Sequence, residues 1–492
     1  MSRTDISDEF WVNYLQNAQV TETHEEKLKR EKVIVLLRST LQEFIRCVKK
    51  EHDYKREVLP PILFPFGSYG IGGYIKNADI DIVMIAPSSI KRNDFFKFFP
   101  TNLKQLATIR DVECIKRTAV PIIKCVVDNI SIDISFVRLK EKKVDAQMNF
   151  LDDTLLNDLD EVCLASIDGP RVHQFIMKQI KSQHLTIFRT CLQCIKYWAT
   201  RRQIYNKPTG YLNGSSWTML LLKTYQKEKN NSDELTITHL LEQFFLTWLE
   251  WPWPAPVILT NHIPGKDGTR LEYRTLKEFE ESVMPIVSPC YPVISTAPNV
   301  TKSTLKVIQR EFERGELLSH DEIDPHEVLR KLFHGLDYFK RFTHYLSITT
   351  SCSRQRSHEI WTRKMPYNVP QLVSLIESRR DFKLIQPAYW PKQYTKNYRT
   401  NRERAALQQG ELMDEMEATS SSEPFNPGTL HLTYYFIGIK TEESCKSDIT
   451  PTNKSFLAIL DTRKSTNDDD VHFAISHMKR KQVAKLMNIK CD

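Results

Sequence analysis

Three aspartates on predicted strands are the feature that most constrains this chain. Asp79 and Asp81 alternate with isoleucine and methionine, and further along the chain Asp133 alternates with isoleucine and phenylalanine. That period is typical of half-buried strands with carboxylates on one face and a core on the other. Because residues two apart on a strand are spaced roughly 6 to 7 Å, the three acids can bracket two hard cations about 3.5 to 4 Å apart. The pattern predicts a metal site on one face of a sheet.

A glycine–serine turn precedes the acids. Phe66, Gly67, Ser68 and Tyr69 stand where a predicted strand gives way to a helix, and their backbone N–H groups and the serine hydroxyl can cradle phosphate oxygens. Two Mg²⁺ ions on carboxylates suit phosphoryl or nucleotidyl transfer, because one ion activates an attacking hydroxyl and the other neutralises a triphosphate. Alone, an Asp-x-Asp pair is usually a solvated face and a Gly-Ser pair a turn. Their joint order favours the catalytic interpretation.

Length and charge limit the class of protein. A chain of 492 residues has room for about three domains, and a net charge of +8 is a mild excess that is consistent with a polyanionic partner. No apolar run approaches the roughly 18 residues of a membrane span, and no signal-peptide core opens the chain, so we expect a soluble intracellular protein without membrane association. Ten scattered cysteines suit a reducing compartment. Cys191 and Cys194 are expected in a helical core, with zinc binding as the alternative.

The organisation along the chain changes twice. Thr23 and Glu26 form a capping-box pattern before a long amphipathic helix, and a strand-rich region then includes a hairpin turned by Asp128 and Asn129. The chain is mainly helical from about 145 to 335 and mixed beyond 338. In that last part we expect strands at 342–349 and 430–439, helices at 354–364, 369–378 and 471–487, and mobile loops at 415–424 and 468–470.

A second group of polar residues follows the catalytic sheet. Lys196 lies on the apolar side of a predicted helix over 188–202, where it needs an anionic partner. It is either a salt-bridged or snorkelling lysine, or a cation aimed at a triphosphate. Tyr205 and the glycine-containing turn at 210–217 come next. Beside the three aspartates, these residues favour the nucleotide interpretation.

In these residues the chain resembles a eukaryotic poly(A) polymerase of the cleavage-and-polyadenylation type, within the DNA polymerase β-like nucleotidyltransferase superfamily. The resemblance covers about residues 20 to 490. Its later segments are absent from the shorter uridylyl- and CCA-adding relatives. The segments that carry it are 66–87, 120–136, 188–205, 251–257, 284–292 and 478–482.

The resemblance implies an α+β multidomain fold. It combines a nucleotidyltransferase mixed sheet with helices, a central helical domain and a C-terminal RRM-like α/β domain. The implied divisions are 1–28 for an N-terminal segment packing with the central domain, 29–144 for the nucleotidyltransferase catalytic domain, 145–337 for the central helical domain and 338–492 for the RNA-binding domain. An RRM-like fold does not by itself guarantee that bases stack on its sheet.

The resemblance also implies a reaction, namely template-independent addition of AMP from ATP to RNA 3′ ends in mRNA polyadenylation. Asp79, Asp81 and Asp133 would be catalytic and would hold two Mg²⁺ ions, for which Mn²⁺ can substitute. The implied partners are ATP, the RNA 3′ end and the cleavage and polyadenylation machinery, and the implied state is a nuclear monomer. The residues implied around ATP are Phe66, Gly67, Ser68, Asp79, Asp81, Asp133, Lys196, Tyr205, Gly214 and Ser215.

Four positions depart from the family pattern. Asp168 and Lys207 each stand where the family has asparagine, Ile75 replaces a threonine, and Ser215 replaces a valine. A carboxylate at Asp168 would repel a triphosphate unless Lys207 compensates. Two alternatives therefore stay open: another RNA nucleotidyltransferase, such as a uridylyltransferase, and a catalytically silent RNA-binding paralogue. The Ser/Thr-rich basic tail of many relatives is also missing, so a cytoplasmic location is a second expectation beside the nuclear one.

Overall fold

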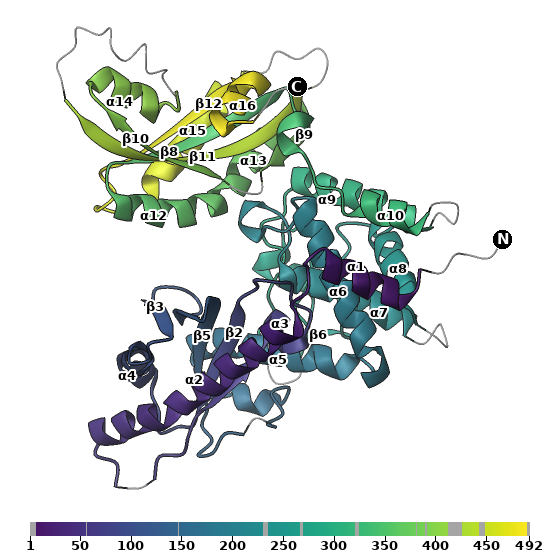
Figure 1. The fold of residues 1–492 in the computed structure, drawn as a ribbon, viewed down its shortest axis with the longest axis vertical. Coiled ribbons are helices and arrows are strands. Elements are labelled where there is room, and N and C mark those ends of the chain that lie inside the picture. The colour runs from purple at the N-terminus through teal and green to yellow at the C-terminus, as the bar shows by residue number, and fades with distance from the viewer. Residues whose placement is uncertain are drawn as a thin grey trace.

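Two sheets and a group of helices make up the molecule (Figure 1). In Figure 1 the first sheet and its helices lie at the bottom, the central helices at the right and the second sheet at the top. The expected loop at 415–424 lies outside the described residues. The structure is a computed structural model that describes residues 6–55, 57–145, 147–229, 235–265, 269–319, 324–379, 381–388, 391–411, 426–441 and 448–489.

The first sheet carries the three aspartates. Strands β2 and β5 are parallel neighbours at its centre, and the other pairings are antiparallel. The turn of the β4–β5 hairpin is formed by Asp128 and Asn129, with φ of +49° and +67°, which confirms the predicted hairpin and is typical of a type I′ turn. The strand order is β1 (Ile62–Pro65), β2 (Ile80–Ala86), β5 (Ile130–Arg138), β4 (Ile122–Val127) and β3 (Ile109–Ile115).

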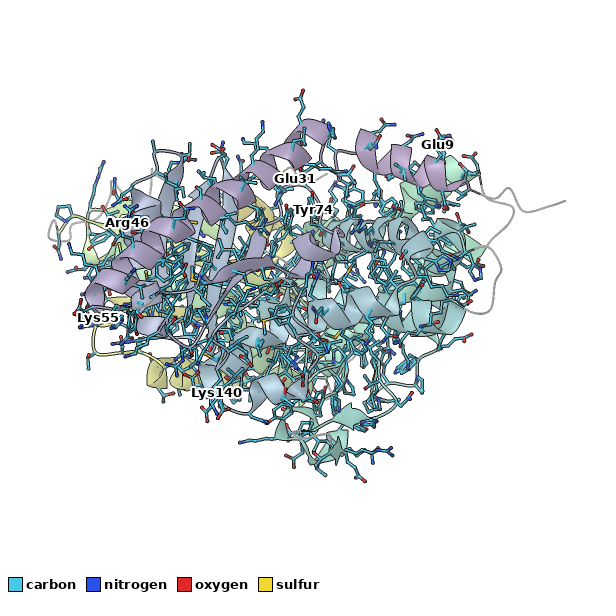
Figure 2. All side chains as sticks on the ribbon, turned by 90° about the horizontal axis from the view of Figure 1, so that it is seen from below. Glu9, Glu31, Arg46, Lys55, Tyr74 and Lys140 are labelled. Carbon is cyan, nitrogen blue, oxygen red and sulfur yellow. The ribbon has the colours of Figure 1, made fainter. Side chains whose placement is uncertain are left out.

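The two faces of this sheet bury different helices. Helices α2 (His24–Glu51) and α4 (Arg92–Lys104) cover the face that bears Ile80, Ile82, Ile132 and Ile134. The predicted capping box of α2 is present, since Thr23 and Glu26 each accept a hydrogen bond from the backbone N–H of the other. Helix α5 (Glu161–Gln179) covers the opposite face. Figure 2 shows α2, with Glu31 and Arg46 labelled, lying along one side of the molecule with α1.

The central helices enclose an aromatic core. Trp198, Trp217, Phe245 and Phe312 pack against one another there, and Cys191 and Cys194 are buried in the same cluster. The N-terminal helix α1 (Asp8–Asn17) joins this region, because Trp11 Nε1 donates to Thr238 Oγ1 over 2.8 Å. The central helices are α6 (Leu185–Arg201), α7 (Gly214–Glu228), α8 (Ile237–Leu249), α9 (Lys302–Gly315) and α10 (Pro325–Leu332), and the short helix α11 (Tyr338–Arg341) follows them.

The second sheet is antiparallel and is covered on both faces. Helices α12 (Gln355–Lys364), α13 (Val369–Glu377) and α15 (Thr450–Thr462) pack on one face. Helices α14 (Asn401–Gln408) and α16 (Arg480–Met487) contact the strands as well, and Tyr434 is fully buried. The sheet therefore offers no open aromatic platform at Tyr434. Its strands are β10 (Lys392–Tyr398), β11 (Gly428–Thr441), β8 (His344–Cys352) and β12 (Val471–Lys479), with β9 (Phe382–Pro387) also paired to β11.

Two C-terminal predictions are wrong. The segment predicted as one helix over 471–487 is strand β12 followed by helix α16, because its first half pairs antiparallel with β8. The predicted mobile acidic loop at 468–470 is anchored instead. Asp470 accepts hydrogen bonds of 2.8 Å from the Arg354 backbone N–H and the Ser357 hydroxyl, so it holds the start of α12. Of the helices in the described ranges, none combines the length and apolar character needed to cross a bilayer.

Candidate active site

The three predicted aspartates converge. Asp81 and Asp133 are register partners on the parallel strands β2 and β5, and Asp79 precedes β2 by one residue on the same side as Asp81. One carboxylate oxygen of each lies within 4.8 Å of those of the other two. The sequence pattern named these three residues, and the parallel register of β2 and β5 places the two strand aspartates side by side.

Burial and mutual repulsion act on this cluster. Burial, followed by the charges of Asp79 and Asp133, raises the pKa of Asp81 to about 7. Burial also raises the pKa of Asp133, and the nearby Lys124 opposes that change. Lys124 Nζ lies 3.2 Å from Asp133 Oδ1. The cluster is thus a set of carboxylates that lacks enough positive charge of its own, which is the state expected of a cation site.

Lys124 is a site residue that the sequence reasoning did not select. Its position follows from the hairpin, since the turn at Asp128 and Asn129 puts Lys124 opposite Asp133. Asp81, Asp133 and Lys124 consequently form one row across β2, β5 and β4. The sequence could have revealed Lys124, because a two-residue turn at Asp128 and Asn129 fixes which residues of the two strands lie opposite each other.

The glycine–serine turn lies against the cluster. Gly67 begins the short helix α3 (Gly67–Ile71) with φ of +62°, and a Cβ on it would stand 2.8 Å from Asp81 Oδ2. Only glycine fits both that backbone conformation and that spacing. The Phe66 backbone N–H donates to the Asp81 carbonyl over 3.0 Å, and the Phe66 ring packs on Gly169 of α5. These contacts fix the turn beside Asp81.

A pocket of about 500 Å³ opens in front of the turn and the acids. Strand β2, helix α3, helix α5 and the start of α7 all contribute to its wall. Asp133 and Lys196 are not among the lining residues, although an Asp133 carboxylate oxygen lies within 4.8 Å of those of Asp79 and Asp81. The predicted site residues that line it are Phe66, Gly67, Ser68, Asp79, Asp81, Tyr205, Gly214 and Ser215. The wall residues that sequence reasoning did not select include His173, Asn213, Thr218, Ser288 and Thr296.

Lys196 lies behind this pocket. Its side chain is 2% exposed, and its ammonium donates to the Gly73 carbonyl over 2.8 Å. Burial lowers the pKa of Lys196 to about 8, although Asp79 and Asp81 act in the opposite direction. A Cβ on Gly214 would stand 2.6 Å from the Tyr205 hydroxyl oxygen. Lys196 is therefore a buried cation that faces the acid cluster rather than a snorkelling lysine.

Helix α7 directs its N-terminus at the pocket. Gly214 is its first residue, and the Asn213 side chain caps it by accepting a hydrogen bond from the Ser216 N–H over 3.0 Å. The uncapped N–H groups and the helix dipole favour negative charge at this end. Ser215 is exposed there. The pocket thus has acids at one side and an anion-binding helix end at the other.

Asp168 and Lys207, two of the positions that differ from the family pattern, lie in different parts of the structure. Asp168 lines the pocket, its Oδ1 is buried without a hydrogen-bond partner in the described chain, and burial raises its pKa to about 7. Lys207 does not line the pocket; burial lowers its pKa, and Glu278 opposes that change. In the described residues Lys207 forms no ion pair with Asp168, so the condition under which Lys207 would compensate Asp168 is not met. Burial thus makes the charged form of Asp168 less favourable than that of an ordinary aspartate.

Comparison with known sequences decides the family. Three domain models match in order: the poly(A) polymerase nucleotidyltransferase domain at residues 7–180, the poly(A) polymerase central domain at 187–335, and the poly(A) polymerase predicted RNA binding domain at 337–489. The chain belongs to the poly(A) polymerase family. It is accordingly a nucleotidyltransferase with a mixed α/β catalytic fold, a helical central domain and a C-terminal sheet domain of the RNA-binding type.

Individual poly(A) polymerases match over most of the chain. Poly(A) polymerase PAPalpha of Candida albicans is 29% identical over 390 residues, which are 78% of this chain and 69% of that protein. The poly(A) polymerase of Dictyostelium discoideum is 28% identical over 484 residues, which are 96% of this chain and 56% of that protein. The chain thus spans little more than half the length of the second relative.

Solved structures of smaller nucleotidyltransferases are also similar. The Cid1 poly(U) polymerase with bound MgGTP has 17% sequence identity and a TM-score of 0.46, over 67% of this chain and 98% of that one. Cid1 in complex with its short product ApU has 16% identity and a TM-score of 0.43, over 68% of this chain and 100% of that one.

Proposed function

We propose that this member of the poly(A) polymerase family adds AMP from ATP to the 3′ ends of RNA without a template. The observation that supports this most is the pocket in which Asp79 and Asp81 face Gly67, Ser68 and the N-terminus of α7. It combines carboxylates that suit a divalent cation with N–H groups that suit phosphate oxygens. That pairing is what a nucleoside triphosphate bound to a metal requires.

The acid cluster fits divalent cations. Three carboxylates with oxygens within 4.8 Å of one another match the preference of Mg²⁺ for oxygen ligands, and Mn²⁺ can substitute. The raised pKa of Asp81 reflects negative charge that its surroundings leave uncompensated. Asp79, Asp81 and Asp133 would hold two ions, which when bound lower the pKa of the attacking hydroxyl and neutralise charge on the triphosphate.

The chain's own residues would position the reactants. The RNA 3′-hydroxyl releases its proton to solvent and its oxygen forms a bond to the α-phosphorus of ATP, while the bond from that phosphorus to the oxygen shared with the β-phosphate breaks and pyrophosphate leaves. Gly67 and Ser68 would hold phosphate oxygens next to Asp81. Lys196 would stabilise the charge of the site from behind the wall, and Tyr205 and Gly214 would border the nucleotide. Most of the rate enhancement then comes from positioning and electrostatics.

Three units would share the work, with the boundaries 29–144, 145–337 and 338–492 and an N-terminal segment 1–28 packed on the central unit. The C-terminal unit would contact RNA through surface side chains, because Tyr434 on its sheet is buried. As partners we propose the RNA 3′ end and the cleavage and polyadenylation machinery. As a cellular state we propose a monomer in the nucleus.

Primer extension tests the proposal. The protein is incubated with oligo(A) and one of ATP, UTP, CTP or GTP, in Mg²⁺ or in Mn²⁺, and the products are sized. We expect extension with ATP. Preference for UTP would instead identify a uridylyltransferase, and binding of oligo(A) with no incorporation of any nucleotide would identify a silent RNA-binding protein. The Asp133→Ala variant is the control for a contaminating polymerase.

A further inference from the structure

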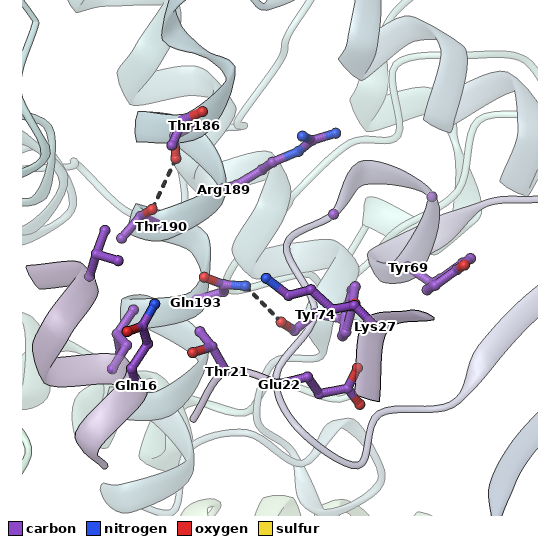
Figure 3. Close-up of a pocket in the computed structure, with 14 residues that line it drawn as sticks. Gln16, Thr21, Glu22, Lys27, Tyr69, Tyr74, Thr186, Arg189, Thr190 and Gln193 are labelled. Atoms are coloured by element: carbon purple, nitrogen blue, oxygen red, sulfur yellow. Dashed lines mark hydrogen bonds between the residues drawn. The ribbon is translucent and has the colours of Figure 1, made fainter. Parts of the chain in front are cut away.

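A second cavity borders α3 and shares no lining residue with the nucleotide pocket; Figure 3 shows the residues that line it. It has a volume of about 390 Å³ and is bounded by α1, the start of α2, α3 with the turn after it, and α6. An adjoining hollow of about 400 Å³ shares Lys27, Tyr69, Gly70 and Tyr74 with it. Such volumes are in the range of sites for small ligands. Nothing in the proposed reaction uses this cavity.

Two cations line the cavity from opposite elements. Lys27 is an exposed residue of α2 and Arg189 is a half-buried residue of α6, and in the described part of the chain neither forms an ion pair. Figure 3 shows Lys27 extending toward α6. Arg189 uses Nε to donate to the Ile71 carbonyl over 2.6 Å, which leaves the terminal nitrogens of its guanidinium available. Burial lowers the pKa of Arg189, as expected for a half-buried cation without an anion.

The carboxylate in the wall is already occupied. Both oxygens of Glu22 accept from Arg30 Nε over 2.8 Å, in an ion pair whose side chains are 7% and 2% exposed. The Arg30 guanidinium also lies 4.9 Å from the centre of the Tyr74 ring. Because Glu22 and Arg30 neutralise each other, Lys27 and Arg189 are the charges that remain on the wall of this cavity, and Glu31 lines the adjoining hollow.

Uncharged polar groups complete the lining. The Thr21 hydroxyl oxygen is buried and has no hydrogen-bond partner in the described residues. The Gln193 amide donates to the Tyr74 carbonyl over 3.0 Å, which keeps the α6 wall in place. The rings of Tyr69 and Tyr74 lie 5.5 Å apart. A ligand that accepts hydrogen bonds and carries negative charge would satisfy the cations and the hydroxyl together.

We propose that this cavity binds a phosphate group between Lys27 and Arg189. A phosphate offers several oxygens to a guanidinium fork and a lysine at once, and the Thr21 hydroxyl can donate to another. Its source is either a free phosphate, such as inorganic phosphate or pyrophosphate, or the phosphodiester backbone of RNA. The site is separate from the nucleotide pocket, although both use residues of α3.

Calorimetric titration of the full-length protein with inorganic phosphate and with pyrophosphate, without divalent cations, tests the site. We expect saturable binding that weakens about tenfold in Lys27→Gln and in Arg189→Gln, the usual effect of losing one charge-assisted hydrogen bond. Lys29→Gln, an exposed lysine of the same helix that does not line the cavity, should bind like the unmodified protein. If the Arg189 variant does not fold, the phosphate titration of the Lys27 variant alone decides the proposal.

Two results would overturn the proposal. One is the absence of saturable binding at about millimolar phosphate or pyrophosphate. The other is binding that Lys27→Gln leaves unchanged and Lys196→Gln abolishes, which would place the anion in the nucleotide pocket. Oligo(A) added to the phosphate-loaded protein then separates the sources. If oligo(A) displaces the phosphate that is bound at Lys27, the site is assigned to the RNA backbone. If the phosphate stays bound, the site is assigned to a free phosphate.

Discussion

Asp81 and Asp133 are register partners on neighbouring parallel strands, and Lys124 on the next strand continues their row. The row places two acids and one base on the same face of the sheet. Its charge is unbalanced by one negative unit even before Asp79 is added. Burial is the largest cause of the raised pKa of Asp81 and of Asp133, and Asp79 adds to both shifts while Lys124 opposes them.

Replacement of Asp133 by alanine should abolish extension. We expect the rate in Mg²⁺ to fall by at least about a hundredfold, because a bound metal supplies several kcal/mol of charge stabilisation. The melting temperature should not fall, since the change removes a partly buried charge. Ser131→Ala, on the same face of the same strand, is the control. Retention of more than a few per cent of the rate, measured by primer extension, would contradict the assignment of Asp133.

Replacement of Lys124 by methionine should destabilise the metal-free protein by less than about 1 kcal/mol, because the pair with Asp133 is partly exposed. Mg²⁺ should remove this difference in stability between the two proteins, since the bound cation takes over the charge that Lys124 supplied. Thermal unfolding of both proteins with and without Mg²⁺ measures this. An equal stabilisation of both proteins by Mg²⁺ would argue against a cation at Asp133.

Replacement of Lys196 by methionine should impair the use of ATP. The site would lose a buried positive charge that faces Asp79 and Asp81, so we expect a higher KM or a lower kcat for ATP. Lys223→Met is the matched control, because that helical lysine also donates to a backbone carbonyl, at Ile258, outside the pocket. If steady-state kinetics stay unchanged while the melting temperature drops, Lys196 is only structural.

Asp168 should make stability depend on pH. Burial raises its pKa from 3.8 to about 7, so between those values the folded protein holds a proton that the unfolded chain has released. The free energy of unfolding should therefore fall as the pH rises from about 4 to 7, by at most roughly 1.4 kcal/mol per unit of pKa shift. Asp168→Asn should make this slope shallower by the share of one group, because Asp81 has a similarly raised pKa and keeps its own share, and Asp158→Asn should leave the slope unchanged. Denaturant unfolding at several pH values measures both, and identical slopes in all three proteins would refute the role.

The basic end of β12 should contribute to RNA binding. Lys479 and Lys481 are exposed. Arg480 donates to the Phe342 carbonyl over 2.8 Å, so it is left unchanged in the variant to preserve the fold. We expect Lys479→Gln with Lys481→Gln to weaken oligo(A) binding and to reduce the salt slope by roughly 0.7 for each RNA phosphate that the variant no longer neutralises. Base preference should not change, because phosphate contacts carry no sequence information. Lys454→Gln on α15 is the control. An unchanged salt slope in the double variant would show that neither Lys479 nor Lys481 contacts RNA phosphates.

Local pattern was sufficient where neighbours along the chain determine the structure. The alternation around Asp81, the capping box at Thr23 and the turn at Asp128 and Asn129 each predicted an element that the structure contains. Pattern failed at 471–487, where a short strand precedes a helix. There the pairing of β12 with β8, more than a hundred residues earlier, decides the strand.

The sequence by itself determined the kinds of groups at the site: three aspartates, a glycine–serine turn and a lysine on an apolar helix face. The tertiary structure alone decided which of them share a surface and how buried each is. It placed Lys124 beside Asp133, Lys196 behind the pocket, and Asp168 in its wall without Lys207. These outcomes depend on distance and burial, which fix the pKa of a group and are set by contacts between residues far apart in the chain.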